Sequence, residues 1–369
     1  MSAPAFIPGR ELARLFFAEA VQPVLAAELP GLRYGAALLH TGSEVLGFDT
    51  EMSADHGWGP RVDLFLRDED YEALRDRIDA ALRRGLPHRF RGWPTSFSEP
   101  DPVDHGTQHL DPRDEGPVRH KVVITAPRRF VREYLGYELA GEIEPADWLT
   151  FPSQKLRTLT DGPVFRDEAG LGELRARFAW YPQDVWLYLL AAGWTRIGQE
   201  EHLMGRAGTV GDEVGSAVIG ARLVRDVMRL CFLMERVYAP YPKWFGTAFA
   251  RLRCGPELLP HLSEALAART WREREHHLVT AYEAVARMHA ELALTDPLPT
   301  AARDFHGRPF RVMALHGFER ALLARVRDER VRHIAARPVI GSVDQLSDST
   351  DLLANALWRE RVRRLYEER

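Results

Sequence analysis

The spacing of hydrophobic and polar positions differs between the first and the second part of the chain. In the first part, short apolar runs of strand length alternate with segments of helical periodicity. The strand candidates are Arg33–His40, Arg61–Leu66 and Lys121–Thr125. The helix candidates are Glu11–Leu29 with a bend near Pro23, the segment from Tyr71 to Leu82 with Asp68 as its cap, and Arg128–Leu135. This alternation predicts an α/β layer over residues 1–150.

From about Asp167 onward the pattern is almost entirely helical, which predicts a helical-bundle domain over residues 151–369. The apolar residues of Gly211–Tyr238 cover most of the circumference of a helix, so we expect this helix to be central and buried. Further helices are expected at Trp271–Ala293 and Phe310–Arg330. The apolar and then basic tail from Leu352 is expected to pack either on the body of the chain or on another subunit of a homo-oligomer.

Between two of the expected elements, residues 87–116 are rich in Pro, Gly, Asp and His. This composition predicts a long surface excursion, and long excursions in compact domains are often functional.

Composition limits the classes of function. The 369 residues carry a net charge of −4, which argues against a nucleic-acid partner held by bulk charge. Two separated cysteines indicate neither a zinc cluster nor a disulfide framework. The first residues lack the pattern of a signal peptide, and the longest apolar run, Val185–Trp194, is about half of what a bilayer crossing needs. We therefore expect a cytoplasmic protein without a membrane partner.

The candidate chemistry lies after the first expected strand. Gly42 and Ser43 form a Gly-Ser turn, and eleven residues separate Ser43 from Asp55. Backbone N–H groups and a serine hydroxyl at such a turn can hold the phosphates of a nucleotide. Carboxylates at positions i and i+2 of a following strand face the same way and can share Mg²⁺ ions. This layout resembles the nucleotidyltransferase signature, in which Gly-Ser is followed by Asp-x-Asp or Asp-x-Glu.

The sequence around the turn extends this resemblance. The run from Gly42 to Arg61 and several later segments are similar to an uncharacterised bacterial domain family related to the aminoglycoside (kanamycin-type) nucleotidyltransferases. The later segments are Asp147–Leu149, Tyr181–Tyr188, Arg196–Glu201 and Ala239–Trp244. The resemblance spans roughly residues 30 to 330. It implies a nucleotidyltransferase-like mixed sheet with flanking helices, followed by a helical substrate-binding domain.

One position departs from the signature. The pattern implies a second acid at position 57, but the chain reads Asp55-His56-Gly57. Asp63, within the strand candidate, is the expected replacement, since positions 55 and 63 would share a face of a continuous strand. The alternatives are a turn or cap role for Asp55 and an edge or solvent-facing position for Asp63. Asp55 and Asp63 are thus the candidate catalytic and metal-binding residues.

Two basic residues of the second domain are candidates for contact with the nucleotide. Arg225 belongs to the arginine stripe Arg222, Arg225 and Arg229, which could line a phosphate-binding cleft or form the wet edge of a buried helix. Lys243 lies in a Tyr-Pro-Lys-Trp turn, and the resemblance implies that a lysine in this part of the helical domain approaches the nucleotide. The alternative is a solvated lysine.

Three functions follow from these residues. The first is a Mg²⁺-dependent nucleotidyltransferase that moves a nucleoside monophosphate from ATP or another NTP to a hydroxyl of a small polar acceptor. The second, motivated by Gly57, is a catalytically degenerate protein that binds a nucleotide or metabolite and regulates a partner. The third is an antitoxin-like enzyme that nucleotidylates a protein.

Overall fold

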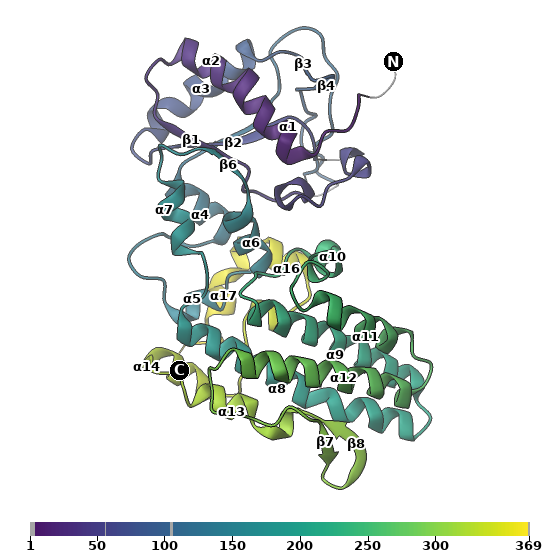
Figure 1. Ribbon diagram of the computed structural model, residues 1–369. Helices are drawn as coiled ribbons and strands as arrows, with labels where there is room; N and C mark the ends of the chain where they lie inside the picture. The colour runs from purple at the N-terminus through teal and green to yellow at the C-terminus, as the bar shows by residue number, and fades with distance from the viewer. Residues whose placement is uncertain (1–3, 56, 104–105, 368–369) are drawn as a thin grey trace. The chain divides into compact units, whose positions relative to one another are not determined.

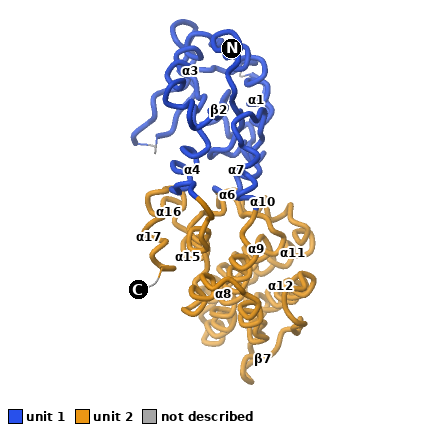
Figure 2. The backbone as a smooth tube through the Cα atoms, turned by 90° about the vertical axis from the view of Figure 1, so that its left-hand side faces the viewer, with its two compact units in different colours: residues 1–140, 155–179 blue, residues 141–154, 180–369 orange. Residues whose placement is uncertain are grey.

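The structure, a computed structural model, describes residues 4–55, 57–103 and 106–367. The chain divides into two compact units, neither of which is continuous in sequence (Figure 2). Unit 1 comprises Met1–Ala140 and Lys155–Ala179, and unit 2 comprises Gly141–Gln154 and Trp180–Arg369. None of the helices in the described ranges combines the length and the apolar character of a membrane span.

A mixed sheet lies at the centre of unit 1. Its strands are β1 (Tyr34–Ala37), β2 (Arg61–Leu66), β5 (Lys121–Thr125) and β6 (Val164–Arg166). Their order is β5-β2-β1-β6, with β2 parallel to β5 and β1 antiparallel to both β2 and β6. The bounds of β2 and β5 are those predicted from their apolar runs, whereas β6 was not predicted.

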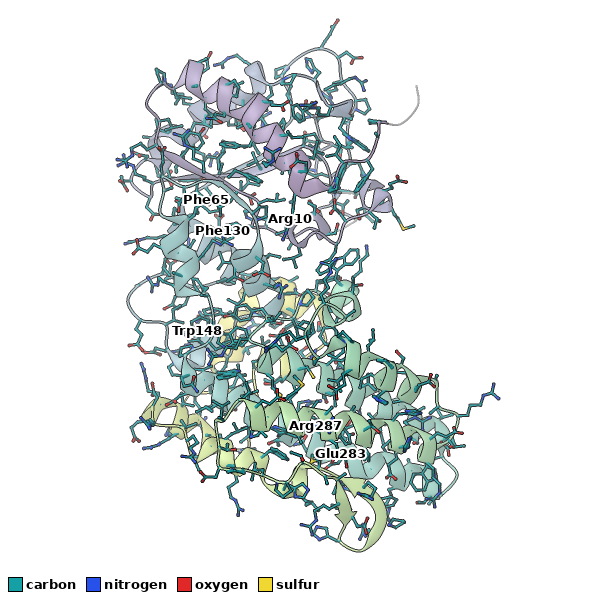
Figure 3. All side chains as sticks on the ribbon, viewed as in Figure 1. Arg10, Phe65, Phe130, Trp148, Glu283 and Arg287 are labelled. Atoms are coloured by element: carbon teal, nitrogen blue, oxygen red, sulfur yellow. The ribbon has the colours of Figure 1, made fainter. Side chains whose placement is uncertain are left out.

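Strand β2 is buried along its whole length, so its two faces pack against different helices. One face packs on the core formed with α1 (Gly9–Phe16), α2 (Gln22–Glu28) and α3 (Tyr71–Gly85) through Val62, Leu64 and Leu66. Alternation of side chains along a strand places Arg61, Asp63 and Phe65 on the opposite face. There the ring of Phe65 meets Phe130 of α4 (Pro127–Leu135) edge-on, with 5.4 Å between ring centroids (Figure 3).

Helices cover both faces of this sheet (Figure 1). Unit 1 also contains α7 (Leu171–Arg177) and most of α6 (Ser153–Asp161), which begins in unit 2. The predicted α/β layer with flanking helices is therefore confirmed.

The N-terminal helix is irregular near Pro23, where a bend or a break was predicted. A π-helical turn, η1 (Phe17–Val21), joins α1 to α2 just before Pro23. Because proline has no N–H to donate to the preceding turn, the regular hydrogen-bond ladder is interrupted here.

The predicted helix cap at Asp68 is wrong. The residue before α3 is Asp70, and the Asp68 carboxylate instead accepts a hydrogen bond from the Arg128 backbone N–H in the first turn of α4, at 3.1 Å. Helix α4 follows β5, and the pairing of β5 with β2 brings its first turn close to Asp68. The local sequence around Asp68 does not reveal this distant partner.

The excursion over residues 87–116 has structure of its own. It contains the short pair β3 (Arg89–Phe90) and β4 (Trp93–Pro94) and an isolated bridge between Phe97 and Leu110. Thr95, Ser96 and Phe97 are buried, so this segment packs against the domain.

Unit 2 is a bundle of helices, as predicted (Figure 1). Its long helices are α8 (Gln183–Thr209), α9 (Glu213–Met234), α11 (Gly255–Ala267) and α12 (Trp271–Glu291). Helix α9 is central, since it packs against α8, α11 and α12. Shorter elements are α5 (Pro145–Trp148), η4 (Pro242–Trp244), α10 (Phe245–Phe249), η5 (Ala314–His316), α13 (Phe318–Leu323) and α14 (Glu329–Ala335).

The predicted helix at Phe310–Arg330 is wrong over its first part. This part of the chain forms a hairpin of β7 (Arg303–Phe305) and β8 (Arg308–Val312), and helix α13 starts only at Phe318. The turn consists of His306 and Gly307, both at positive φ (47° and 73°). Two consecutive residues with positive φ form the type of tight turn that matches strand twist, so the local turn overrides the helical spacing.

The C-terminal tail packs on unit 2 of its own chain. It contains α15 (Val343–Leu346), α16 (Thr350–Ala354), η6 (Ala356–Trp358) and α17 (Arg359–Arg363). Arg359 and Arg363 both pair with the buried carboxylate of Asp147, the latter at 2.8 Å. The Tyr366 hydroxyl donates a hydrogen bond to the Gly341 carbonyl oxygen at 2.8 Å. The body of the chain is thus one partner of the tail.

Candidate functional site

The Gly-Ser turn of unit 1 follows β1 as predicted. Gly42 has φ 144° and precedes the short 3-10 helix η2 (Ser43–Leu46). A Cβ atom at Gly42 would lie 2.7 Å from the Oε2 atom of Glu44 and would also overlap the guanidinium of Arg61. Only glycine therefore satisfies both the backbone angle and the close approach of these charged groups.

Helix α1 holds the turn in place. The Arg10 guanidinium, labelled in Figure 3, donates to the Val45 carbonyl oxygen from Nε at 3.0 Å and from Nη2 at 2.7 Å. Two N–H groups of one guanidinium that converge on the same oxygen fix its position more strictly than a single donor does. The turn is thus a built element and not a loose connection.

A buried ion pair lies beneath the turn. Arg61, the first residue of β2, places its Nε atom 2.7 Å from Oε1 of Glu44, and both side chains are buried. Its Nη2 atom donates to the Thr41 carbonyl oxygen at 2.7 Å. The guanidinium therefore joins the start of β2 to the residues on both sides of Gly42, and its charge is paired with that of Glu44.

Asp63 follows Arg61 at i+2 on the same strand face. It is 2% exposed, and its Oδ2 atom accepts the Leu39 backbone N–H at 2.7 Å. Its Oδ1 atom lies 2.9 Å from Nδ1 of His40. Burial raises the pKa of Asp63, but His40, Arg61 and the Leu39 N–H together outweigh burial and hold this pKa below its ordinary value. Asp63 is therefore a buried, paired carboxylate that ties β2 to the end of β1.

A second cation stands beside Arg61. Lys121 is the first residue of β5 and is in register with Arg61. Its ammonium donates to the Gly57 carbonyl oxygen at 2.9 Å. Burial, reinforced by the charge of Arg61 and opposed by Glu44, lowers the pKa of Lys121 from 10.5 to about 8. Lys121 is thus held partly desolvated in a region that already contains a guanidinium.

A side chain at Gly57, the position where the signature implies an acid, would point toward this lysine. It has φ 67°, and the nearest atom to a Cβ built there is Nζ of Lys121, at 3.7 Å. Asp and Asn tolerate this left-handed conformation better than other residues with a side chain. An acid at position 57 would consequently meet the Lys121 ammonium.

The predicted carboxylates lie on different elements. Asp55 ends the 3-10 helix η3 (Glu51–Asp55) and is exposed, whereas Asp63 is buried in β2. The Asp55 backbone oxygen contacts Nδ1 of His109 at 3.0 Å. His56 lies outside the described residues. Within the described ranges, no three His, Cys, Asp or Glu side chains gather into a group that could hold a metal.

The charged residues of β2 do not fit a Mg²⁺ ion. Mg²⁺ requires several oxygen ligands in octahedral geometry. Both oxygens of Asp63 already accept or pair with groups of Leu39 and His40, and its i−2 neighbour on the strand face is the cation Arg61. A two-carboxylate metal site on this strand would need a different residue at position 61.

The basic candidates of unit 2 have separate environments. Lys243 in η4 is exposed, with its ammonium 5.0 Å from the centre of the Trp244 ring. Arg225 of α9 pairs with Asp348 and lines a pocket within unit 2. Arg222 instead pairs with Glu200 at 2.7 Å. The arginine stripe is therefore divided between different partners.

Sequence reasoning missed Glu44, Arg61 and Lys121 as members of the site. One signal was available for the two cations, because each begins a predicted strand with a charge. Their convergence depends on the parallel pairing of β2 with β5, which the apolar runs do not specify.

Comparison with known proteins adds a family match over part of the chain. Residues 148–245 match a family model described as a domain of unknown function, DUF4037. No curated protein matches the chain. A crystal structure of a nucleotidyltransferase-like protein from Exiguobacterium sibiricum 255-15 is similar over 86% of this chain and 89% of that chain, with 11% sequence identity and a TM-score of 0.32.

Proposed function

We propose that unit 1 binds the phosphates of a nucleoside triphosphate at the Gly42–Ser43 turn and that the site is catalytically degenerate. Arg61 and Lys121 would supply the positive charge that a nucleotidyltransferase takes from its metal ions. The nucleotide then acts as a bound signal and is not a substrate. ATP is the first candidate, as expected from the sequence.

One observation supports this proposal above the others. Arg61 lies two residues before Asp63 on the same face of β2, and its buried guanidinium lies next to the Gly-Ser turn, where it pairs with Glu44. A metal-dependent transferase needs carboxylates on this strand face so that Mg²⁺ can bridge the triphosphate. A guanidinium there would repel a metal ion and attract phosphate oxygens.

The neighbouring lysine supports the same assignment. A Lys121 ammonium with a lowered pKa gains most from an anion that replaces its lost hydration. Ser43, half-buried at the start of η2, supplies a hydroxyl next to Gly42. Together these residues offer hydrogen-bond donors for an anion.

Titration calorimetry with a non-hydrolysable ATP analogue in EDTA tests the role of each residue. We expect Lys121→Met to weaken binding about tenfold or more, because a charge-assisted hydrogen bond is lost. Ser43→Ala should weaken it several-fold. Arg75→Gln removes an exposed guanidinium that pairs with Asp76 on α3, and this control should bind as the wild type does.

The Mg²⁺-dependent transferase predicted from the sequence is the rival. It requires Asp55→Ala to abolish binding or transfer of the nucleoside monophosphate, whereas the degenerate site requires Asp55→Ala to leave binding in EDTA unchanged. If no NTP binds with or without Mg²⁺, both proposals are wrong.

A further inference from the structure

Unit 2 contains a pocket of its own. Its volume is about 440 Å³, within the ~300–1,000 Å³ range of small-molecule sites. Trp180, Tyr181 and Tyr238 form one aromatic wall, with ring centroids 4.7–5.1 Å apart. Aromatic walls of this kind favour a flat, apolar ligand body.

Two arginines also line the pocket. Arg225 and Arg229 are one turn apart on α9, and both line the pocket. Each pairs with the carboxylate of Asp348, in the second case at 2.8 Å between Nη2 of Arg229 and Oδ1 of Asp348. A carboxylate thus already occupies the position between the two guanidinium groups.

This internal carboxylate is easily displaced. The side chain of Asp348 is 58% exposed and lies between the short helices α15 and α16. Exposed ion pairs contribute little to stability, since water competes for both partners. By contrast, Arg229 is only 18% exposed, so it gains from a partner that also fills the pocket.

The remaining charged group of the lining is already hydrogen-bonded. Asp344, the other acidic residue of the lining, accepts hydrogen bonds from the backbone N–H and the hydroxyl of Ser153, at 2.9 and 3.1 Å.

We propose that this pocket binds a small organic carboxylate with a flat, apolar body, whose carboxylate takes the place of Asp348 between Arg225 and Arg229. The body of the ligand packs against the aromatic wall. This site lies entirely within unit 2 and is independent of the nucleotide site proposed for unit 1.

Three probes that share an indole ring and differ in charge test the proposal. They are indole-3-acetate, indole-3-acetamide and tryptamine, and calorimetry on the full chain measures their affinities. We expect the carboxylate to bind at least about tenfold more tightly than the amide, because charge-assisted hydrogen bonds to two guanidinium groups are the stronger ones. The amine is expected to bind most weakly.

Two variants make the test specific. Asp348→Asn removes the internal competitor, so it should raise the affinity for indole-3-acetate several-fold. Arg229→Gln should lower it about tenfold or more. Arg222→Gln, on the same helix but outside the pocket lining, is the matched control and should change nothing. Unchanged thermal unfolding midpoints show that each variant is folded, and Asp348→Asn is a mild change on an exposed residue.

The opposite signs would overturn the proposal. If tryptamine binds most tightly, or if Asp348→Asn weakens binding, the pocket is a cation site in which Asp348 is a ligand contact. If none of the three probes binds at millimolar concentration, the pocket does not hold a ligand of this class.

Discussion

Replacing Lys121 by methionine separates the function of this residue from its effect on stability. Lys121 is partly desolvated and lies beside Arg61, so its charge opposes folding in the free protein. Methionine keeps the length of the side chain and removes the charge. We therefore expect Lys121→Met to bind a triphosphate more weakly and yet to be more stable than the wild type at pH 7, a trade-off that is common at functional sites.

The magnitude follows from the pKa. One pKa unit corresponds to about 1.4 kcal/mol, so a drop from 10.5 to about 8 limits the cost of the charged form to roughly 3 kcal/mol. Solvent access and the lost hydrogen bond to the Gly57 carbonyl oxygen reduce the gain. We expect the free energy of unfolding of Lys121→Met to exceed that of the wild type by about 1 kcal/mol at pH 7.

The pH dependence of stability tests independently whether the Lys121 charge opposes folding. Between about pH 8 and pH 10.5 the unfolded chain retains the Lys121 proton while the folded chain releases it, so raising the pH stabilises the wild type at this residue. The variant lacks this contribution. Its advantage should therefore shrink as the pH rises through this window.

Urea unfolding of both proteins at a series of pH values measures this difference. Lys155, whose pKa burial also lowers to about 8, contributes equally to both proteins and cancels. A variant that is no more stable at pH 7, shows the same pH slope as the wild type and binds the triphosphate with unchanged affinity would refute the reasoning.

Three further predictions concern other buried or open positions. Asp63→Asn should lower the free energy of unfolding by about 2–3 kcal/mol at pH 7. Because the pKa of Asp63 lies below its ordinary value, this loss should fade as the pH falls through the unfolded and then the folded pKa, and an equal loss at all pH values in urea unfolding would contradict it. Gly57→Asp should weaken triphosphate binding in EDTA, since the new carboxylate neutralises Lys121; stronger, Mg²⁺-dependent binding would instead indicate a metal site. Asp147→Asn should cost about 3 kcal/mol and expose the C-terminal tail to proteolysis, because two arginines lose their buried partner; a tail as protease-resistant as in the wild type would count against this.

The elements with continuous apolar runs could be predicted from the sequence. Strands β2 and β5 were predicted with their observed bounds, because both are short runs rich in apolar and β-branched residues. The hairpin at Phe310 was not predicted, since a two-residue turn with positive φ at His306 and Gly307 overrides helical spacing.

The candidate site was only partly predictable. The Gly42–Ser43 turn was predicted from the local sequence. The neighbours of this turn come from distant segments, and their convergence is set by strand pairing and by the close packing of Arg61 under Gly42. A charge at the first position of a strand is ordinarily a solvated end, so the burial of Arg61 could not be read from its position.

The most direct test of the central claim is the Mg²⁺ dependence of nucleotide binding by the wild-type protein. Calorimetric titration with a non-hydrolysable ATP analogue is carried out once in EDTA and once in millimolar Mg²⁺. The account predicts binding in EDTA with an affinity within a few-fold of that in Mg²⁺, because Arg61 and Lys121 provide the positive charge. Binding that appears only with Mg²⁺ and disappears in Asp55→Ala would contradict it.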